Sequence, residues 1–381
     1  MQESPVQPLA SIIVLYMAGS PWVGRCLDSL RRNIPQSTPH ELIIVGNGVS
    51  EEPALPTVGN GHVRFLRTEA NLGFGGGCNW AARFARGRYV VLLNDDTAIE
   101  PGWLEALIDA AETHPGAGAV GSLVLSPDGT IEEAGRVLWR DGVSHGVGAT
   151  RRSPSTGWPD VYEVDCCSAS SLLVRRSDWE AIGGFDERYF PAYYEDTDLC
   201  LSLRTRGRAV MCATASRVRH EGSASTSLLW RRFLGLRNHR ILAAKWSPVL
   251  TVFDVRPRDE PSIADVERTA RHASRRRQDI YHTFGMSPHR HVEPAQNPGA
   301  SDTVALLQTE VTHLKMELRL KDEYIAHLVA TKPEMERGLG RVLEDERRQA
   351  RRRERIRAIP VVGRLATWVK RRIDEPRHSQ S

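Results

Sequence analysis

The sequence predicts an α/β fold, with a mostly parallel mixed sheet and helices on both of its faces. Short apolar segments alternate with segments of helical spacing in the first 230 residues, and segment 89–93 is apolar at nearly every position, as a strand buried on both faces should be. The composition of the 381 residues, 40% hydrophobic and 26% charged, excludes wholesale disorder and a fibrous repeat.

The expected elements follow one another along the chain. Apolar, β-rich segments predict strands at 9–16, 41–45, 62–66 and 89–93. Helical spacing predicts a helix over 22–33, and Pro101 begins another that runs to about His114. Because ligands of such sheets sit beyond the carboxyl ends of the strands, segments 46–48 and 94–96 are the places to search for a site.

The chain beyond residue 227 changes in character several times. Segment 228–253 predicts a surface helix followed by a strand or loop, 261–284 predicts a basic helix, and 285–300 has the proline and glycine content of a linker. In 301–330, eight positions follow one another at alternating steps of three and four residues, from Val304 to Leu328, and seven of them are apolar. This spacing is typical of a coiled coil. The alternatives are self-association, giving a homodimer through 301–331, and an amphipathic helix packed on its own domain.

The charge of the chain is concentrated near its end. The net charge is only +4, while segment 337–357 holds nine Arg against four acidic residues. The rest is close to neutral, so no nucleic-acid partner is expected. Segment 358–373 mixes apolar residues with Arg and Lys, which predicts a basic amphipathic helix on an anionic membrane surface; a solvated basic tail is the alternative.

The six cysteines include no CxxC pair, so a zinc ribbon is not expected. The first residues have neither a basic region nor a long apolar run, and no stretch reaches the roughly 18 apolar residues that span a bilayer. We therefore expect a cytoplasmic protein with reduced thiols, peripheral on the inner face of the plasma membrane.

Two adjacent carboxylates, Asp95 and Asp96, belong to the Asn94-Asp95-Asp96 segment that directly follows the strand at 89–93. Such a pair is electrostatically costly unless a cation joins the two groups. Mg²⁺ or Mn²⁺ takes a few carboxylate oxygens and shares its other positions with phosphates. The alternative is an Asp pair that caps the helix near Pro101.

Segment 71–79 contains four glycines, which permit a tight turn and close approach of the backbone to a ligand. A P-loop is excluded because no Gly-Lys-Ser/Thr follows. A dinucleotide fingerprint is disfavoured because Cys78 stands where its third Gly or Ala would be, and because the preceding strand is not the first.

Acidic residues Glu195, Asp196 and Asp198 stand at the expected start of a helix, whose dipole stabilises ionised carboxylates. An ionised carboxylate suits a base, although capping alone would also explain the residues. The turn at 183–187 precedes this segment and is expected to set its direction. His220 follows later, and a lone histidine is weak evidence for a ligand.

Taken together and in order, segments 71–79, 92–97, 183–207 and 220–223 resemble family-2 glycosyltransferases of the GT-A fold, especially the bacterial rhamnosyltransferase-like branch. The resemblance covers about residues 9–227. It implies that Asp96 and His220 hold a divalent cation (Mn²⁺ or Mg²⁺) and that the Glu195-Asp196 pair supplies the catalytic base, Asp196. It also implies donor contacts at Tyr16, Asn47, Asn71, Gly73, Phe74, Gly77, Asn79, Asp95 and Asp96.

Two positions depart from the family's pattern. Gly46 stands where the family usually has an Asp that recognises the uracil or thymine ring, and Met17 stands where Asn usually follows the tyrosine that ends the first strand. Asn47 or a backbone group is the expected substitute. Arg204 and Arg206 could offer phosphate contacts, but no role is assigned to them.

The resemblance implies an inverting, metal-dependent transfer of a sugar, rhamnose or another hexose, from a nucleotide-diphosphate donor to a hydroxyl of a cell-surface glycan or lipid-linked acceptor. The expected organisation is an N-terminal tail (1–8), a GT-A domain (9–256), a helix and Pro-rich linker (257–300), a coiled coil (301–331) and a basic tail (334–381). One alternative is a nucleotidyltransferase, for which segment 17–20 is a poor phosphate loop. The other is a non-catalytic coiled-coil scaffold of a glycan-synthesis complex with a decayed donor site.

Overall fold

The computed structural model describes residues 7–17, 20–49, 62–152, 159–222, 228–285, 308–328 and 330–331. The chain forms two compact units, residues 1–319 and 320–381, and the sheet and the candidate site belong to the first. The boundary between the units falls inside the segment expected to form a coiled coil. Most of the expected linker, residues 301–307 and the whole basic tail from 334 onward lie outside the described residues.

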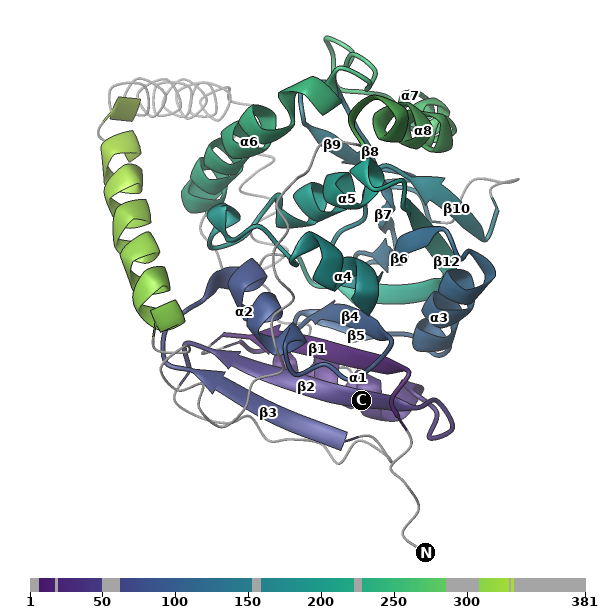
Figure 1. The fold of residues 1–381 in the computed structure, drawn as a ribbon, viewed down its shortest axis with the longest axis vertical. Helices are drawn as coiled ribbons and strands as arrows, with labels where there is room; N and C mark the ends of the chain where they lie inside the picture. The colour runs from purple at the N-terminus through teal and green to yellow at the C-terminus, as the bar shows by residue number, and fades with distance from the viewer. Residues whose placement is uncertain are drawn as a thin grey trace, which may run out of the picture. The chain divides into compact units, whose positions relative to one another are not determined.

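One half of the central sheet is parallel (Figure 1). It consists of four neighbouring strands in the order β3 (His62–Thr68), β2 (His40–Asn47), β1 (Ala10–Tyr16) and β4 (Tyr89–Asn94). Each of these strands was expected from its apolar run, and each extends a few residues beyond or short of the expected range. Their carboxyl ends lie at one edge of the sheet, where ligands of α/β folds bind.

The other half of the sheet is mixed, which confirms the expected mixed sheet, with the antiparallel pairs concentrated in this half. Strand β11 (Ser171–Arg175) runs antiparallel between β4 and β6 (Ala117–Leu125). Strand β12 (Ala209–His220) is parallel to β6 and carries β10 (Val161–Val164) antiparallel at its other edge. Strand β11 enters the sheet between β4 and β6 without being joined to either by a turn, and among the described strands of this half only β6 and β7, which follow each other along the chain, form a hairpin.

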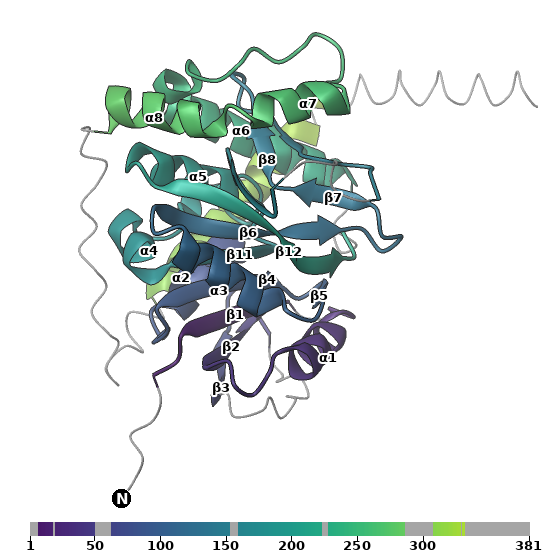
Figure 2. The same ribbon diagram turned by 90° about the vertical axis from the view of Figure 1, so that its right-hand side faces the viewer.

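Helices cover both faces of the sheet, as expected (Figure 2). The alternation along β1 separates the two cores: Ile12 and Val14 face one side, and Ile13 and Leu15 face the other. The first core includes residues of α1 (Val23–Asn33) and α3 (Trp103–Thr113). The second includes residues of α2 (Gly73–Ala82), α4 (Arg176–Ile182) and α5 (Glu195–Thr205).

Short elements complete the region around the strand ends. They are β5 (Thr97–Ile99), which pairs with β12, β7 (Ile131–Ala134), which pairs with β6, the two-stranded β8 (Arg136–Leu138) and β9 (Ser144–Gly146), and the 3₁₀ helix η1 (Glu187–Tyr189).

The C-terminal helices of the first unit pack on α5 and β8. Helix α6 (Leu228–Leu250) ends in a turn rather than the strand that was one alternative, and the helix expected over 261–284 is two helices, α7 (Ile263–Ala270) and α8 (Ala273–Phe284). Trp246, Phe253 and Ile280 bury their side chains here together with residues of α5. Asp165 lies beneath α8 and accepts two hydrogen bonds from the Arg276 guanidinium, at 3.0 and 2.7 Å.

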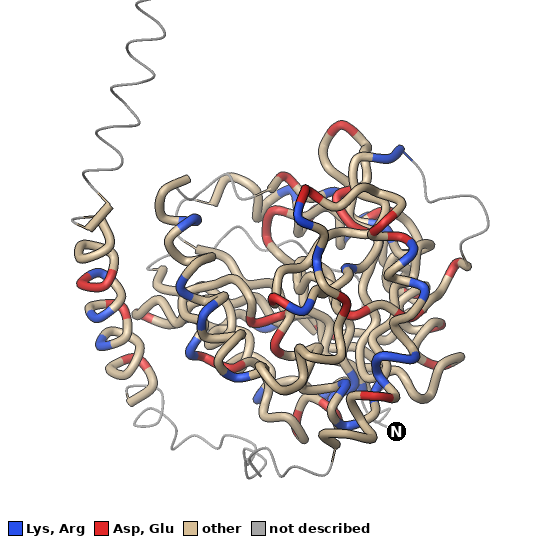
Figure 3. The backbone as a smooth tube through the Cα atoms, turned by 90° about the horizontal axis from the view of Figure 1, so that it is seen from above, with Lys and Arg blue, Asp and Glu red and all other residues tan. Residues whose placement is uncertain are grey.

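Acidic and basic residues are interspersed along the described chain (Figure 3). Within the described residues, no helix combines the length and the apolar character that a membrane span requires.

Candidate active site

Asp96 and His220 meet because β5 pairs with the end of β12. Asp96 directly precedes β5, and the antiparallel register sets Thr97 opposite His220. The Glu221 backbone N–H continues the ladder by donating to the Asp96 carbonyl at 3.0 Å. The His220 Nε2 atom therefore lies 3.3 Å from Asp96 Oδ1, as the resemblance implied for these two residues.

The electrostatics of this pair is set by carboxylates. Burial by itself lowers the pKa of His220, but the neighbouring carboxylates of Asp96 and Glu132 outweigh it and raise that pKa to about 10. The pKa of Asp95 is raised to about 6, mainly by burial. The negative charge of Asp96 also raises this pKa, whereas a hydrogen bond with Ser20 lowers it. In the metal-free protein, His220 therefore carries a proton that a bound cation would displace.

The residues at this place fit a divalent cation. Asp96 Oδ1 is buried and accepts no aligned hydrogen bond, while His220 presents Nε2 to the same point. In the part of the chain that the structure describes, no cluster of three or more His, Cys, Asp or Glu side chains forms a closed metal cage. Mg²⁺ and related ions are commonly bound by one or two carboxylates plus substrate phosphates, so Asp96 and His220 are the residues that would hold one.

Three residues beside this pair were missed by the sequence reasoning. Glu132 Oε2 lies 2.9 Å from His220 Nδ1, and Glu221 forms an ion pair with Arg25 of α1. The Pro127-Asp128-Gly129 segment between β6 and β7 is a turn signal that would have predicted a hairpin with Glu132 on its second strand. Glu221 lies in segment 220–223 but was given no role of its own, and no local pattern marks Arg25.

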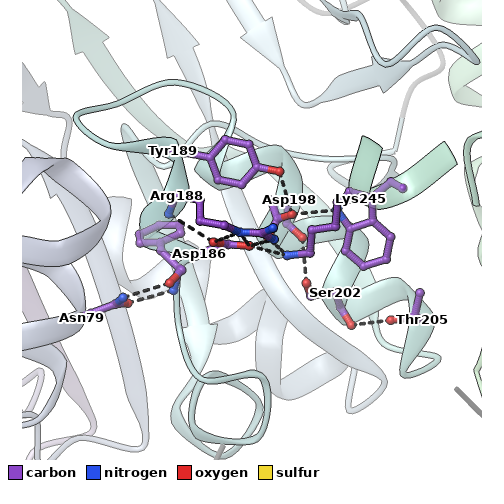
Figure 4. Close-up of polar contacts among 10 residues, drawn as sticks. Asn79, Asp186, Arg188, Tyr189, Asp198, Ser202, Thr205 and Lys245 are labelled. Carbon is purple, nitrogen blue, oxygen red and sulfur yellow. Dashed lines mark hydrogen bonds and ion pairs between the residues drawn. The ribbon is translucent and has the colours of Figure 1, made fainter. Parts of the chain in front are cut away.

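The three acidic residues at the start of α5 have different surroundings. The Asp198 carboxylate accepts from the Tyr189 hydroxyl at 2.9 Å and from the Trp246 indole N–H at 2.7 Å. The Lys245 ammonium bridges it to Asp186, at 2.7 and 2.9 Å (Figure 4). Asp198 is therefore fully engaged in holding α5 against η1 and α6.

Glu195 is buried and its Oε2 atom has no hydrogen-bond partner. Burial is the largest cause that raises the pKa of Glu195 well above its ordinary value, and the charges of Asp196 and Asp198 add to it. Asp196, in contrast, is partly exposed, and its Oδ1 atom accepts from the Thr197 backbone N–H at 2.6 Å. Of the three carboxylates, Asp196 is the one that combines a hydrogen bond from the α5 backbone with access to solvent.

The turn before α5 is held in an uncommon conformation. Tyr193 and Tyr194 have φ values of +82° and +77°, which side chains other than glycine seldom adopt. The buried Asn238 amide of α6 donates to the carbonyls of Tyr189, Ala192 and Tyr193 at 2.8 to 3.0 Å. The strain is thus maintained by hydrogen bonds from a distant helix, immediately before the candidate base.

Strand β7 has one residue beside each of the two groups, the Asp96–His220 pair and Asp196. Glu132 of β7 contacts His220, and the next residue, Glu133, pairs with Arg136 at 2.8 Å. The charge of Asp196 acts on both Glu133 and Arg136. Within the residues that the structure describes, no hydrogen bond or ion pair joins Asp196 directly to Asp96 or His220.

The glycines of 73–77 belong to helix α2, and of these only Gly73 has the positive φ of the tight turn that was expected. A Cβ on Gly73 would lie 2.7 Å from the Pro191 carbonyl, one on Gly75 would lie 3.2 Å from Phe185, and one on Gly77 would lie 2.4 Å from Leu15. These glycines let α2 pack closely against its neighbours. Gly73 also has a φ of +69°, which glycine adopts without strain.

Asn47 organises the start of α2. Its amide donates to Asn71 Oδ1 and to the Gly73 carbonyl, at 3.0 and 3.1 Å, and its Oδ1 accepts from the Leu72 N–H at 2.7 Å. Its side chain is buried, with 1% of the residue exposed. Asn47 therefore positions segment 71–73 in this structure, which leaves its amide no free group for the expected contact with a nucleobase.

Gly46 is enclosed by its neighbours. A Cβ there would lie 2.4 Å from Val49 Cγ2, 3.1 Å from Phe65 and 3.2 Å from the Tyr16 hydroxyl. The space that the family's Asp would need is filled, so the departure at Gly46 is matched by the packing around it.

Other residues that were expected to contact a ligand instead form hydrogen bonds or ion pairs with residues of this chain. Figure 4 shows Asn79 reaching the turn before Asp186. The Asn79 amide donates to the Phe185 carbonyl and to Glu187, at 2.9 and 3.0 Å, which fixes the turn at 183–187. Arg204 is fully buried between Val164, Ala273 and Asp165, and Arg206 donates to the Ala181 carbonyl. The suggested phosphate contact of Arg204 is therefore excluded by its burial.

Comparisons with known proteins agree on one family. A family model described as Glycosyl transferase family 2 matches residues 11–173. An N-acetylglucosaminyl-diphospho-decaprenol L-rhamnosyltransferase of Mycobacterium tuberculosis is 32% identical over 243 residues, which are 57% of this chain and 77% of that protein. The rhamnosyltransferase WbbL of Escherichia coli K12 is 42% identical over 62 residues, 16% of this chain and 23% of that one.

A solved structure is similar in fold. The crystal structure of GalNAc-T7 with UDP, GalNAc and Mn²⁺ has a TM-score of 0.51 and 14% sequence identity, covering 74% of this chain. The match spans 56% of the GalNAc-T7 chain, somewhat more than half of its length.

Proposed function

The chain belongs to glycosyl transferase family 2 and is similar to its rhamnosyltransferases, and on that premise we propose that it transfers a sugar with inversion. The donor is a nucleotide-diphosphate sugar, rhamnose or another hexose, and the acceptor is a hydroxyl of a cell-surface glycan or lipid-linked precursor. The observation that carries the proposal is the meeting of Asp96 and His220 at 3.3 Å beyond the carboxyl ends of the sheet.

In the proposed reaction, the Asp196 carboxylate accepts the proton of the acceptor hydroxyl as the oxygen attacks the anomeric carbon. The bond from that carbon to the diphosphate breaks, and the diphosphate leaves with the bonding electrons. A divalent cation bound at Asp96 and His220 would supply Lewis-acid stabilisation of the charge on the diphosphate. In an inverting transfer, base and leaving group act from opposite sides of the anomeric carbon, so the proposal requires Asp196 and the Asp96–His220 pair to face opposite sides of the sugar ring.

Donor contacts are proposed for residues around the carboxyl ends of β1 and β4 and the start of α2. Asp95 stands next to Asp96, and segment 71–74 lies beside the turn that precedes α5, since the Phe74 N–H donates to the Pro191 carbonyl. The proposed set is Tyr16, Asn71, Gly73, Phe74, Asp95 and Asp96, whereas Gly77, which the resemblance also implied, is buried in α2 against Leu15. Asn47 supports this set through its hydrogen bonds to segment 71–73, and Asn79 fixes the turn at 183–187.

A homodimer through 301–331 is proposed from the exposure of its apolar seam. In residues 308–319 of the first unit, Glu310 and His313 are buried, whereas Val311, Leu314 and Leu318 are exposed. The helix thus contacts its own unit by a polar face and leaves the heptad positions uncovered. Sedimentation of the full chain and of the Leu314→Asp, Leu318→Asp variant tests this; equal masses contradict the dimer.

Binding to the inner face of the plasma membrane is proposed from the basic tail alone, whose sequence suits an anionic surface. Flotation with anionic liposomes compares the full chain with one ending at Lys332. We expect only the full chain to float, and equal flotation contradicts a role of the tail.

A thermal-shift panel of nucleotide sugars tests the transferase directly. One nucleotide sugar should stabilise the protein in the presence of Mn²⁺, because a ligand that binds only the folded state stabilises it by mass action. The same sugar should then be transferred to a lipid-linked acceptor. A non-catalytic scaffold predicts neither stabilisation nor transfer with any donor.

A further inference from the structure

Strand β7 deviates from regular pairing at one residue. Its register with β6 pairs Val124 with Glu133 and Leu125 with Ile131, so Glu132 between them has no partner. Glu132 is the extra residue of a β-bulge. Bulges bend a strand locally and re-aim a side chain, and they are over-represented next to active sites.

The re-aimed Glu132 side chain reaches His220 across a strand. Leu125 of β6 pairs with Ile131 of β7 and with Arg219 of β12, so β7 and β12 lie on the two sides of β6. Strands two apart are about 9.6 Å from each other. The 2.9 Å contact between Glu132 Oε2 and His220 Nδ1 therefore requires both side chains to lean over the end of β6.

The contact leaves His220 with two distinct nitrogens. Nδ1 is taken by Glu132 and Nε2 faces Asp96. A carboxylate that accepts from one ring N–H fixes the tautomer, so that the other nitrogen presents its lone pair. Glu132 itself is directed at the ring and its side chain is 41% exposed.

We infer that Glu132 is a positioning residue, which orients His220 through Nδ1 so that Nε2 and Asp96 can hold one divalent cation. This inference rests on the proposed function, because it deepens the cation site of that proposal. It adds a residue from the β6–β7 hairpin to a site otherwise built by β5 and β12.

The test is Mn²⁺ binding to the full chain, measured without donor by the electron paramagnetic resonance signal of free Mn²⁺. Glu132→Ala should weaken the affinity about 10- to 100-fold, as loss of an outer-shell partner of a ligating histidine does. Glu132→Gln keeps an acceptor for Nδ1–H and should restore most of that loss. Glu132→Ser replaces the Ala variant if the latter does not fold, as judged by thermal melting.

Glu100→Ala is the matched control, because Glu100 pairs with Arg219, the residue before His220, at 2.9 Å. Glu100→Ala removes one negative charge near the end of β12, as Glu132→Ala does, but Glu100 is paired with Arg219 and not with the His220 ring. It should therefore leave the Mn²⁺ affinity nearly unchanged. Equal loss in the Glu100 and Glu132 variants, or none in Glu132→Ala, overturns the inference. If wild type binds Mn²⁺ no better than Asp96→Ala does, the proposed cation site itself is wrong.

Discussion

Neighbouring carboxylates at the start of α5 differ in chemistry because their surroundings differ. Asp198 is engaged by Tyr189, Trp246 and Lys245, while Glu195 is buried with an oxygen that has no partner. Asp196 keeps a hydrogen bond to the α5 backbone and partial exposure. One short acidic segment thus contains a structural anchor, a buried acid and a candidate base.

Replacing Asp196 by Asn should remove transfer and leave the fold intact. General-base help is worth about 10²- to 10⁴-fold, and Asn keeps the shape of the side chain without accepting the proton. Transfer rate and donor affinity are measured on the same preparation. A rate near that of wild type, or an equal loss of donor affinity, would contradict the role of a base.

Glu195 should make the protein less stable as the pH rises. Because burial raises the pKa of this carboxyl in the folded state, the folded protein keeps a proton that the unfolded chain releases above about pH 4.3. The free energy of unfolding then falls with pH, by at most about 1.4 kcal/mol per pH unit.

Glu195→Gln mimics the protonated acid and removes this dependence. Urea unfolding between pH 5 and pH 8 should show the variant gaining stability relative to wild type as the pH increases. A difference between the two proteins that stays constant over this range would show that Glu195 does not titrate as its burial predicts.

A buried ion pair between Arg276 of α8 and Asp165 joins the helices beyond residue 227 to the rest of the first unit. Asp165 is 1% exposed and accepts from Arg276 of α8 and from the Leu138 N–H, with Arg204 of α5 at 3.3 Å. Asp165→Ala should therefore lower the free energy of unfolding by about 3–5 kcal/mol, because it removes the buried carboxylate that two buried guanidinium groups share and leaves their charge only partly compensated.

The exposed pair Arg176–Glu180, at 2.8 Å on α4, is the control for this prediction. Glu180→Ala should cost about 0.3–0.5 kcal/mol, as surface pairs on helices do. Denaturant titration measures both variants. Similar small losses would mean that Asp165 is not the connection between α8 and the sheet.

The sequence predicted the strands β1 to β4 and the helices α1 and α3 well, because apolar runs and helical spacing are local signals. It also predicted that Asp96 and His220 would meet, through a family resemblance rather than through spacing. It failed where packing decides: the glycines of α2 fit against Leu15 and Phe185, which no local pattern shows. The bulge at Glu132 depends on register and was missed for the same reason.

In the first unit as a whole, the two halves of the sheet position different residues of the proposed site. The parallel half, β1 to β4, leads to Asp95 and Asp96, and the mixed half brings His220 and Glu132 to the same edge. Helix α6 adds a third contribution by holding the turn before α5 through Asn238. The proposed site therefore requires segments from β4 through α6, beyond the 11–173 range that the family model matches.

Donor affinity in the presence and absence of Mn²⁺ tests the central claim most directly. Titration calorimetry compares wild type with Asp96→Ala, using the nucleotide sugar found by the thermal-shift panel. We predict that Mn²⁺ tightens donor binding to wild type by about tenfold or more, or 1.4 kcal/mol, and leaves the variant unchanged. Equal tightening in both proteins, or none in either, would contradict a cation site formed by Asp96 and His220.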